Sequence, residues 1–301
     1  MPPAFGRNRR RYWRHFNTPR YDWLRNLALQ RLLPRVEFTE ADWLAHGGGD
    51  VAAALRGFAD ERRLFERGRY VLTTSGMWGG YRHIEAARPR VRSLLANSRY
   101  AARNLQRLAA RLDPARLTVG MHVRRGDFRP AGSVADYRGS WNTALPLDWY
   151  VSIAGQLRRA LGAAVQFLVV SDGRPGELQP LLDAVPCVST ADIPDSDCSD
   201  LLALAGADLL VCSISSFSQW AAFLSEAPYL WYAPNLQVHE GGYGSIWGGS
   251  AAEAAAQAAA AEPPGTPLPR GLAIGADGAL PGELAGLLAK RPPRTRSLPG
   301  H

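Results

Sequence analysis

The chain has 301 residues, which is enough for one large domain or two ordinary ones. Its 46% of hydrophobic and 21% of charged residues exclude a disordered tail and allow a buried core. No apolar run reaches the roughly 18 residues of a membrane span, and no apolar stretch follows the first arginines as in a signal peptide. Three cysteines are too few for a disulfide scaffold, so we expect a cytoplasmic protein.

The positive charge lies in the front of the chain. Residues 1–138 hold 27 basic and 12 acidic side chains, whereas residues 139–301 hold 8 and 15. Such a basic segment suits phosphate, nucleic acid or an anionic membrane face. Aromatic residues interleave the arginines of segment 7–14, as in proteins that bind single-stranded nucleic acid. The same segment is compatible with peripheral contact at the inner face of an anionic membrane.

The front of the chain has few regular patterns. Segments 50–65 and 91–112 have helical spacing, and 69–74 is a candidate strand. A domain boundary is expected near Asp113 and Pro114. We therefore expect an acceptor-side domain, α/β or mostly helical, over residues 1–115.

Strands and helices alternate clearly after this boundary. Apolar, β-branched runs predict strands, and helical spacing follows most of them. The predicted strands are 117–123, 165–170, 185–188, 208–212 and 228–232, and the predicted helices are 177–184, 199–205 and 217–225, the last two with Ser199 and Ser216 as caps. Near-continuous apolar strands separated by helices are typical of a parallel sheet covered on both faces. We expect a Rossmann-like α/β domain over 116–260, with a surface helix at 251–261, and a Pro/Gly-rich tail over 261–301.

The first chemical motif is His122-Val-Arg-Arg-Gly-Asp127, directly after the predicted strand 117–123. Ligands bind at the carboxyl ends of strands in open parallel sheets. Guanidinium groups match phosphate by paired hydrogen bonds, so Arg124 and Arg125 are candidate anion ligands. Gly126 allows a close turn, and Asp127 can hold one arginine by an ion pair.

The second motif runs from Asp200 to Glu226 and places four serines where a strand turns into a helix. A helix N-terminus offers unpaired N–H groups and the positive end of the helix dipole. Serine hydroxyls add donors, so Ser215 and Ser216 are candidate phosphate contacts. Asp172 follows the neighbouring strand 165–170 and is expected near the same cleft.

Together the two motifs resemble the α-1,2-fucosyltransferase family, glycosyltransferase family 11, within the wider group that uses GDP-fucose. The resemblance covers roughly residues 70–235 and is tightest over 117–128 and 200–226. It implies a GT-B-like architecture with two Rossmann-like domains, the C-terminal one holding the nucleotide sugar. Residues 1–20 lack the family's Gly-Asn-Gln opening, so the N-terminal half is expected to be divergent or truncated.

The resemblance also implies roles for single residues. Arg124 and Arg125 match the arginines that hold the donor diphosphate, and Ser215 and Ser216 match the turn that donates to it. The same match implies that His122 lies near the nucleotide and that the carboxylate of Asp200 accepts hydrogen bonds from the guanine N–H groups. Trp78 and Tyr81 fall in the family's aromatic segment and are candidates for stacking on acceptor sugars.

The implied reaction is an inverting, metal-independent transfer of fucose to a galactoside or other glycan hydroxyl, with no cofactor beyond the donor. Asp127 is the nearest candidate base, and its alternative role is to orient an arginine. The alternatives are a transferase that uses another GDP-sugar, an inactive homologue, a metal-dependent transferase using Asp195 and Asp197, and a basic protein that binds nucleic acid or a membrane. Nucleic acid is not expected as a partner, because the strand-end motifs have no role there.

Overall fold

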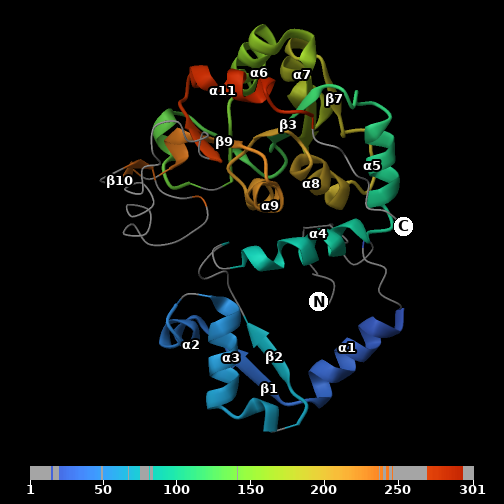
Figure 1. Ribbon diagram of the computed structural model, residues 1–301, viewed down its shortest axis with the longest axis vertical. Helices are drawn as coiled ribbons and strands as arrows, with labels where there is room; N and C mark the ends of the chain where they lie inside the picture. Colours follow the sequence, from blue (N-terminus) through green and yellow to red (C-terminus); the bar gives the residue numbers. More distant parts are fainter. Residues whose placement is uncertain are drawn as a thin grey trace.

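The computed structural model centres on a six-stranded parallel sheet with helices on both faces (Figure 1). It describes residues 15, 20–48, 50–66, 68–74, 81, 84–140, 142–236, 238–239, 242–243, 246 and 270–293. The strand order is β12-β9-β8-β3-β6-β7. The strands are β3 (Leu117–Val123), β6 (Val165–Ser171), β7 (Cys187–Ser189), β8 (Leu209–Val211), β9 (Tyr229–Tyr232) and β12 (Gly271–Ile274). The predicted α/β class, with a parallel sheet in the C-terminal part, is therefore confirmed.

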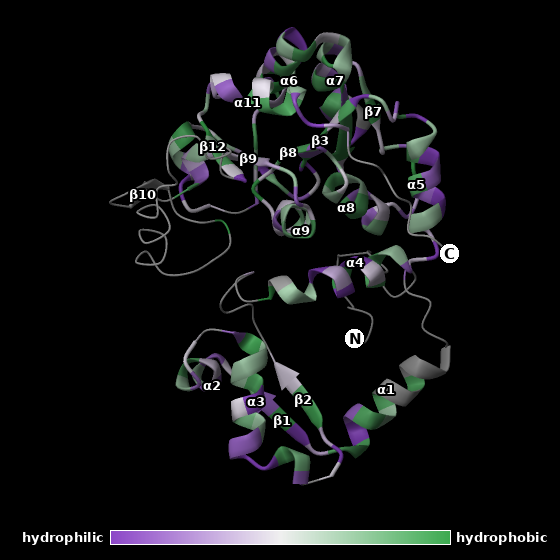
Figure 2. Ribbon diagram, in the orientation of Figure 1, coloured by the Kyte–Doolittle hydropathy of each residue, from purple (hydrophilic) through white to green (hydrophobic). Residues whose placement is uncertain are grey.

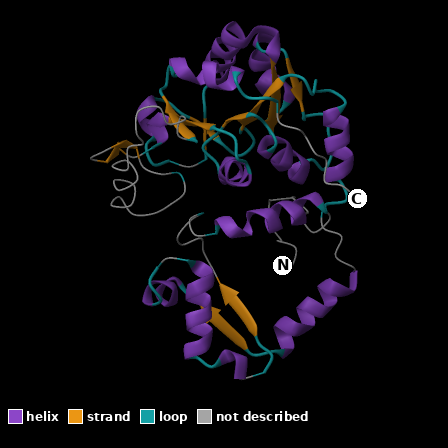
Figure 3. Cartoon of the chain, viewed as in Figure 1, coloured by secondary structure: helices purple, strands orange, loops and turns teal. Residues whose placement is uncertain are grey.

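Helices cover the two faces of this sheet in separate sets (Figure 3). On one face lie α6 (Leu147–Leu161), α7 (Pro175–Ala184) and α11 (Gly282–Ala289), and on the other lie α8 (Asp197–Ala205) and α9 (Ser216–Leu224). Two further helices, α4 (Arg88–Ala96) and α5 (Ala101–Ala109), pack against this second set. The outer helices α6 and α7 carry hydrophilic and hydrophobic residues on different sides (Figure 2). Such amphipathic helices bury their apolar side on the sheet.

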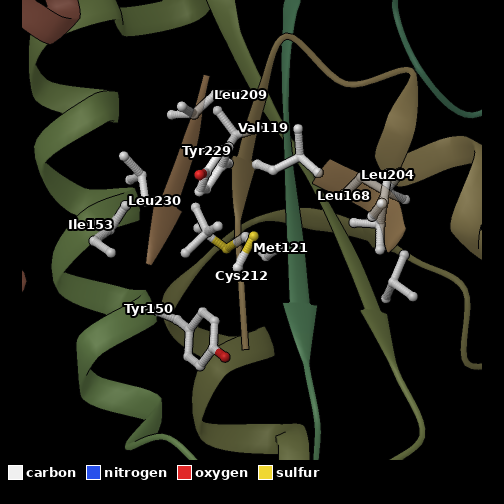
Figure 4. Close-up of a cluster of buried hydrophobic side chains, with 14 of the residues drawn as sticks. Val119, Met121, Tyr150, Ile153, Leu168, Leu204, Leu209, Cys212, Tyr229 and Leu230 are labelled. Atoms are coloured by element: carbon white, nitrogen blue, oxygen red, sulfur yellow. The ribbon is translucent and has the colours of Figure 1, made fainter. Parts of the chain in front are cut away.

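The core lies on both sides of β3, a strand in the interior of the sheet. All seven residues of β3 are buried, and the strand pairs over its whole length with β6. Figure 4 shows Met121 of β3 with Ile153 of α6 to one side and Leu204 of α8 to the other. Gly120 is needed here because a Cβ atom would lie 3.0 Å from Cβ of Ala207. The near-continuous apolar pattern of this strand thus reflects burial on both faces.

The segment expected to be a tail is part of the main fold. In its described part, β12 pairs in parallel with β9, and α11 contacts α6. Trp149 Nε1 of α6 donates a hydrogen bond to the carbonyl of Gly275 at 2.9 Å. The expectation of a loose tail is wrong for residues 270–293, because short apolar runs among Gly and Pro residues still complete the sheet edge. The expected helix at 251–261 lies outside the described residues.

The front of the chain contains a second, smaller unit. Strands β1 (Arg35–Phe38) and β2 (Val71–Thr74) form a two-stranded parallel sheet. Around them lie α1 (Arg20–Leu32), α2 (Glu40–Ala45), α3 (Val51–Glu61) and the short 3₁₀ turn η2 (Leu64–Glu66). This unit has its own core, formed by Phe38, Trp43, Ala54, Phe58, Ala59 and Leu64.

The expected front domain, 1–115, therefore contains elements of two units. Helices α4 and α5 pack against α8, so they extend the main body. The helical spacing expected over 91–112 is confirmed, and the structure divides this segment into two helices, because α4 ends at Ala96 and α5 starts at Ala101. Ser98 Oγ accepts the N–H groups of Tyr100 and Ala101, at 3.3 and 3.4 Å, and so helps to start the second helix.

Short elements complete the described structure. They are the strands β4 (Arg129–Pro130), β5 (Thr143–Ala144), β10 (Val238–His239) and β11 (Gly242–Tyr243), and the 3₁₀ turns η3 (Glu85–Ala87), η4 (Val134–Tyr137), η5 (Gly162–Ala164) and η6 (Ala233–Asn235). In the part of the chain that the structure describes, no helix combines the length and apolar character needed to cross a membrane.

Candidate functional site

The strand order places the two predicted motifs beside each other. After β3 the chain proceeds to β6 and β7 on one side of the sheet, and then returns to β8 and β9 on the other. The strands are thus added in one direction from β3 and in the opposite direction from β8, although β3 and β8 are themselves paired in parallel. In open α/β sheets, ligands bind outside the carboxyl ends of the strands at such a switch point. The arginine motif follows β3 and the serine motif follows β8, so both flank this position.

Arg124 is held by two carboxylates at this edge. Its Nη2 donates to Oδ1 of Asp127 at 2.6 Å, and its Nη1 pairs with Oδ2 of Asp172, which follows β6. The guanidinium carbon lies 5.2 Å from the ring centre of Phe128. A guanidinium has five N–H donors, and the two carboxylates take two of them. Arg124 is therefore fixed in place with donors left for an anionic ligand.

Gly126 permits the close approach of Asp172 to the arginine loop. A Cβ atom at this glycine would collide with the carboxylate of Asp172. With no side chain in the way, Oδ1 of Asp172 accepts the backbone N–H of Arg125 at 2.9 Å. Asp172 thus binds both the backbone and a side chain of the loop, which makes it a positioning residue here.

Arg125 does not join Arg124. Burial raises the pKa values of Tyr137 and Tyr150, and the positive charge of Arg125 partly opposes both shifts. The guanidinium of Arg125 therefore lies near these rings, on the α6 side of the sheet. Its Nε is buried and meets no hydrogen-bond partner among the described residues. The expected pair of arginines on one anion is therefore corrected to a single arginine, because adjacent residues leaving a strand point to opposite faces.

His122 connects the end of β3 to the start of α9. Its Nδ1 lies 2.8 Å from Ser218 Oγ, 2.9 Å from Ser213 Oγ and 3.4 Å from Ser215 Oγ. Its ring packs against Phe217 at 4.9 Å between centres, and Tyr150 donates to its carbonyl at 3.0 Å. The histidine is buried, so it holds the two motifs together rather than facing solvent.

The tip of α9 presents donors at the same edge. Ser215, rather than the predicted Ser216, is the cap: its Oγ accepts the N–H of Ser218 at 3.2 Å. Ser216 is exposed, and no described residue accepts a hydrogen bond from the N–H groups of Ser216 or Phe217. Unpaired N–H groups at the positive end of a nine-residue helix form a favourable environment for a phosphate.

Asp200 is a buried carboxylate in the first turns of α8. It is 7% exposed, and burial raises its pKa to about 7 in spite of the hydrogen bond from Ser196 Oγ at 2.7 Å. Thr190, which follows β7, lies beside this carboxylate, and a hydrogen bond from its hydroxyl lowers the same pKa. Oδ1 of Asp200 is buried and meets no donor within ordinary hydrogen-bond distance among the described residues. A ligand N–H group would stabilise an oxygen in such a place. The start of α8 also differs from prediction, because Ser199 donates to the carbonyl of Ser196 instead of capping the helix.

The aromatic candidates have a different role from the one expected. Tyr81 is buried, with its ring edge against Trp220 at 5.1 Å and against Phe223 at 5.5 Å. Its hydroxyl donates to the carbonyl of Ser216 at 3.5 Å. No ring face is left for a sugar, so stacking by Tyr81 is corrected to support of the α9 tip. Trp78 lies outside the described residues.

Other residues bear on the rival readings. Asp197 lies 3.7 Å from His15, and the described residues contain no cluster of three or more His, Cys, Asp or Glu side chains able to hold a metal ion. All three cysteines are free, and burial raises the pKa of Cys187 and Cys198 to about 11 and of Cys212 to about 12. Such thiols are not nucleophiles at neutral pH.

Sequence reasoning missed two residues of this site. Phe128 stacks on Arg124, and Thr190 lies beside Asp200. Phe128 comes directly after the arginine motif, and Thr190 comes directly after a strand. Because ligands bind at the carboxyl ends of such strands, these positions could have indicated both residues.

Comparison with solved structures finds similarity to POFUT1. The chain matches POFUT1 in complex with GDP-fucose in two crystal forms, at 19% and 17% identity and TM-scores of 0.34 and 0.33. In each case the match covers 61% of this chain and spans only 61% of the other chain. A third match, to POFUT1 in complex with GDP, has 18% identity and a TM-score of 0.27, over 46% of this chain and 50% of the other. No family model and no curated protein matches the chain.

Proposed function

We propose that this chain is an inverting glycosyltransferase that moves fucose from GDP-fucose to a glycan hydroxyl, in the manner of an α-1,2-fucosyltransferase. The observation that carries the proposal is the meeting of two anion-binding elements at the switch point of the sheet. His122 joins them, because its Nδ1 lies 2.8 Å from Oγ of Ser218 in the first turn of α9. Arg124 follows His122 by two residues in the chain. A diphosphate is the ligand that suits one fixed guanidinium and one helix tip together.

The guanine base is assigned to the buried end of the same edge. Guanine N1–H and its amino group are donors, and Asp200 is a buried carboxylate that already accepts hydrogen bonds from the hydroxyls of Ser196 and Thr190. Uracil offers only one ring N–H, so this carboxylate favours GDP over UDP. Because the pKa of Asp200 is about 7, a bound guanine stabilises the ionised carboxylate and favours release of its proton.

In the proposed reaction, the bond between fucose C1 and the β-phosphate oxygen breaks, and its electron pair leaves with GDP. The acceptor oxygen forms the new bond to C1 from the opposite face. Arg124 and the N–H groups of Ser216 and Phe217 stabilise the negative charge on departing GDP. Asp127 is 74% exposed with Oδ2 outside its ion pair, and we assign it to take the acceptor proton.

Turnover of GDP-fucose on a panel of glycans tests this proposal. We expect release of GDP together with a glycan one fucose heavier, and about a hundred-fold slower turnover for Arg124→Ala. Arg116→Ala is the matched control, because Arg116 precedes the same strand at its other end and pairs with Asp113. Equal loss of turnover in both variants, or consumption of UDP-sugars instead of GDP-fucose, would contradict the proposal.

A further inference from the structure

The outer end of the small unit carries the two most exposed large hydrophobic side chains among the described residues. Leu32, at the end of α1, is 81% exposed, and Phe65, in η2, is 72% exposed. Single exposed apolar residues are ordinary on protein surfaces. Two of them at the same end of a unit are candidates for one contact surface.

The chain path brings these two side chains to the same end. The carbonyl of Pro34 accepts the N–H of Val71 at 2.9 Å, and Arg35 is in register with Val71 in the parallel pair of strands. The end of α1 and the start of β2 are thus adjacent, and η2 precedes β2 by a few residues. Figure 1 shows α1, η2 and the starts of both strands together at the lower end of the molecule. We call this surface the Leu32–Phe65 tip.

Arginines surround the apolar pair. Four exposed arginines belong to the tip: Arg31, Arg35, Arg63 and Arg69. Arg63 lies 3.9 Å from Glu66, and Arg35 donates to the carbonyl of Gln30 at 2.8 and 3.0 Å. Among the described residues no carboxylate pairs with Arg31 or Arg69. Figure 2 shows hydrophobic and hydrophilic residues next to each other at this end.

We infer that the Leu32–Phe65 tip binds the surface of an anionic lipid membrane. Leucine and phenylalanine side chains enter the boundary between headgroups and acyl chains, while arginines around them bind anionic headgroups. Each part is weak alone, and stable membrane contact needs two signals of this kind. A single-stranded nucleic acid fits less well, because base stacking needs several aromatic faces, and Phe65 is the one exposed aromatic side chain among the described residues of the tip. This inference is independent of the proposed transferase activity.

Sedimentation of the full chain with lipid vesicles tests the inference. The probes are vesicles of phosphatidylcholine alone and of phosphatidylcholine with phosphatidylglycerol. We expect binding to the anionic vesicles that falls as salt rises. The double variant Leu32→Ser with Phe65→Ser should bind the anionic vesicles at least about ten-fold more weakly. Leu44→Ser is the matched control, since Leu44 is 60% exposed on α2, away from the tip, and it should bind as the unchanged chain does.

A second variant tests the charged part of the tip. Arg31→Gln with Arg69→Gln should weaken binding to anionic vesicles about twenty-five-fold, from about five-fold for each arginine. Unchanged thermal unfolding of each variant shows that the fold is intact. The inference is overturned if the chain does not bind anionic vesicles, or if the tip variants bind them as well as the Leu44→Ser control does. It is also overturned if the tip variants lose binding to single-stranded RNA but keep their binding to vesicles.

Discussion

At the scale of single residues, two aspartates of the sheet edge have different environments and different roles. Asp172 pairs with Arg124 and accepts the N–H of Arg125, so its charge is compensated within the protein. Asp200 is buried, and the loss of water around its carboxylate favours the protonated form in spite of hydrogen bonds from Ser196 and Thr190. The first carboxylate organises the loop, whereas the second is available to a ligand that donates hydrogen bonds.

The pKa of Asp200 predicts how stability depends on pH. It is about 7 in the folded chain, against 3.8 for an ordinary aspartate, so between these values the folded chain holds a proton that the unfolded chain has lost. The free energy of unfolding therefore falls as pH rises through this window, by up to about 1.4 kcal/mol per pH unit, and levels off above it. Denaturant unfolding of Asp200→Asn should lack this part of the slope. Identical pH profiles for both chains would contradict the assignment.

Gly126 offers a test of the arginine loop. In Gly126→Ala the new methyl group collides with Asp172, so the carboxylate must move away from Arg124. We expect affinity for GDP to fall about ten-fold, which corresponds to the loss of one charge-assisted contact. Gly176→Ala, where the added Cβ meets open space, should leave affinity unchanged. Equal affinity in the two variants, measured by titration calorimetry, would show that the loop does not depend on this approach.

At the scale of elements, β3 and α9 make the site by meeting at the reversal of strand order. Their contact depends on His122 and on the serines that surround its Nδ1. Neighbouring serines in this turn should therefore contribute differently to the stability of the fold and to ligand binding. Ser215 caps the helix and is buried, whereas Ser216 is exposed at the first helical position.

Substitution of these two serines separates stability from binding. Ser215→Ala should lower the free energy of unfolding by about 1 kcal/mol, because a helix cap is lost. Ser216→Ala should change it by less than about 0.5 kcal/mol and should weaken GDP binding a few-fold. Denaturant unfolding and calorimetry on both variants check this. The reverse pattern, with Ser216 stabilising and Ser215 neutral, is incompatible with the observed cap.

Some of this arrangement could be predicted from the sequence. The strand Leu117–Val123 matches its prediction, because an unbroken apolar run before a polar turn is the pattern of a strand buried on both faces. The strand-end rule then placed the arginine and serine motifs at one edge. The expectation that both arginines share one anion did not take account of alternation, by which neighbouring residues leaving a strand point to opposite faces, and Arg125 lies near Tyr150 instead.

The misses have equally physical causes. Strand β12 and helix α11 are short and lie among Gly and Pro residues, so only their tertiary contacts with β9 and α6 identify them. Tyr81 was a candidate for sugar stacking because it falls in the aromatic segment of the resemblance, yet its ring is buried against Trp220 and Phe223, far along the chain. Contacts of this range leave no local pattern.

At the scale of the whole molecule, the chain divides into a main body and a small unit with separate cores. The main body extends from α4 to α11, and its sheet needs residues from beyond position 270 for its last strand. The small unit carries the Leu32–Phe65 tip. Donor binding is thus assigned to the main body and membrane contact to the small unit.

The last strand provides a test of this division. Ile274 of β12 is buried at 1% exposure, so Ile274→Ala should lower the free energy of unfolding by about 2–4 kcal/mol. Ala273→Ser, at the exposed neighbouring position, should have little effect. Thermal or denaturant unfolding compares the two. A negligible effect of Ile274→Ala would mean that the segment is a loose tail after all.

The central claim is that Arg124 and the tip of α9 form a binding site for GDP. Titration calorimetry of the unchanged chain with GDP and with UDP tests it most directly, with Arg124→Ala and Arg116→Ala as the paired variants. We predict tighter binding of GDP than of UDP, a loss of about ten-fold to a hundred-fold in GDP affinity for Arg124→Ala, and no loss for Arg116→Ala. GDP affinity that is absent, or that is the same in both variants, would contradict the claim.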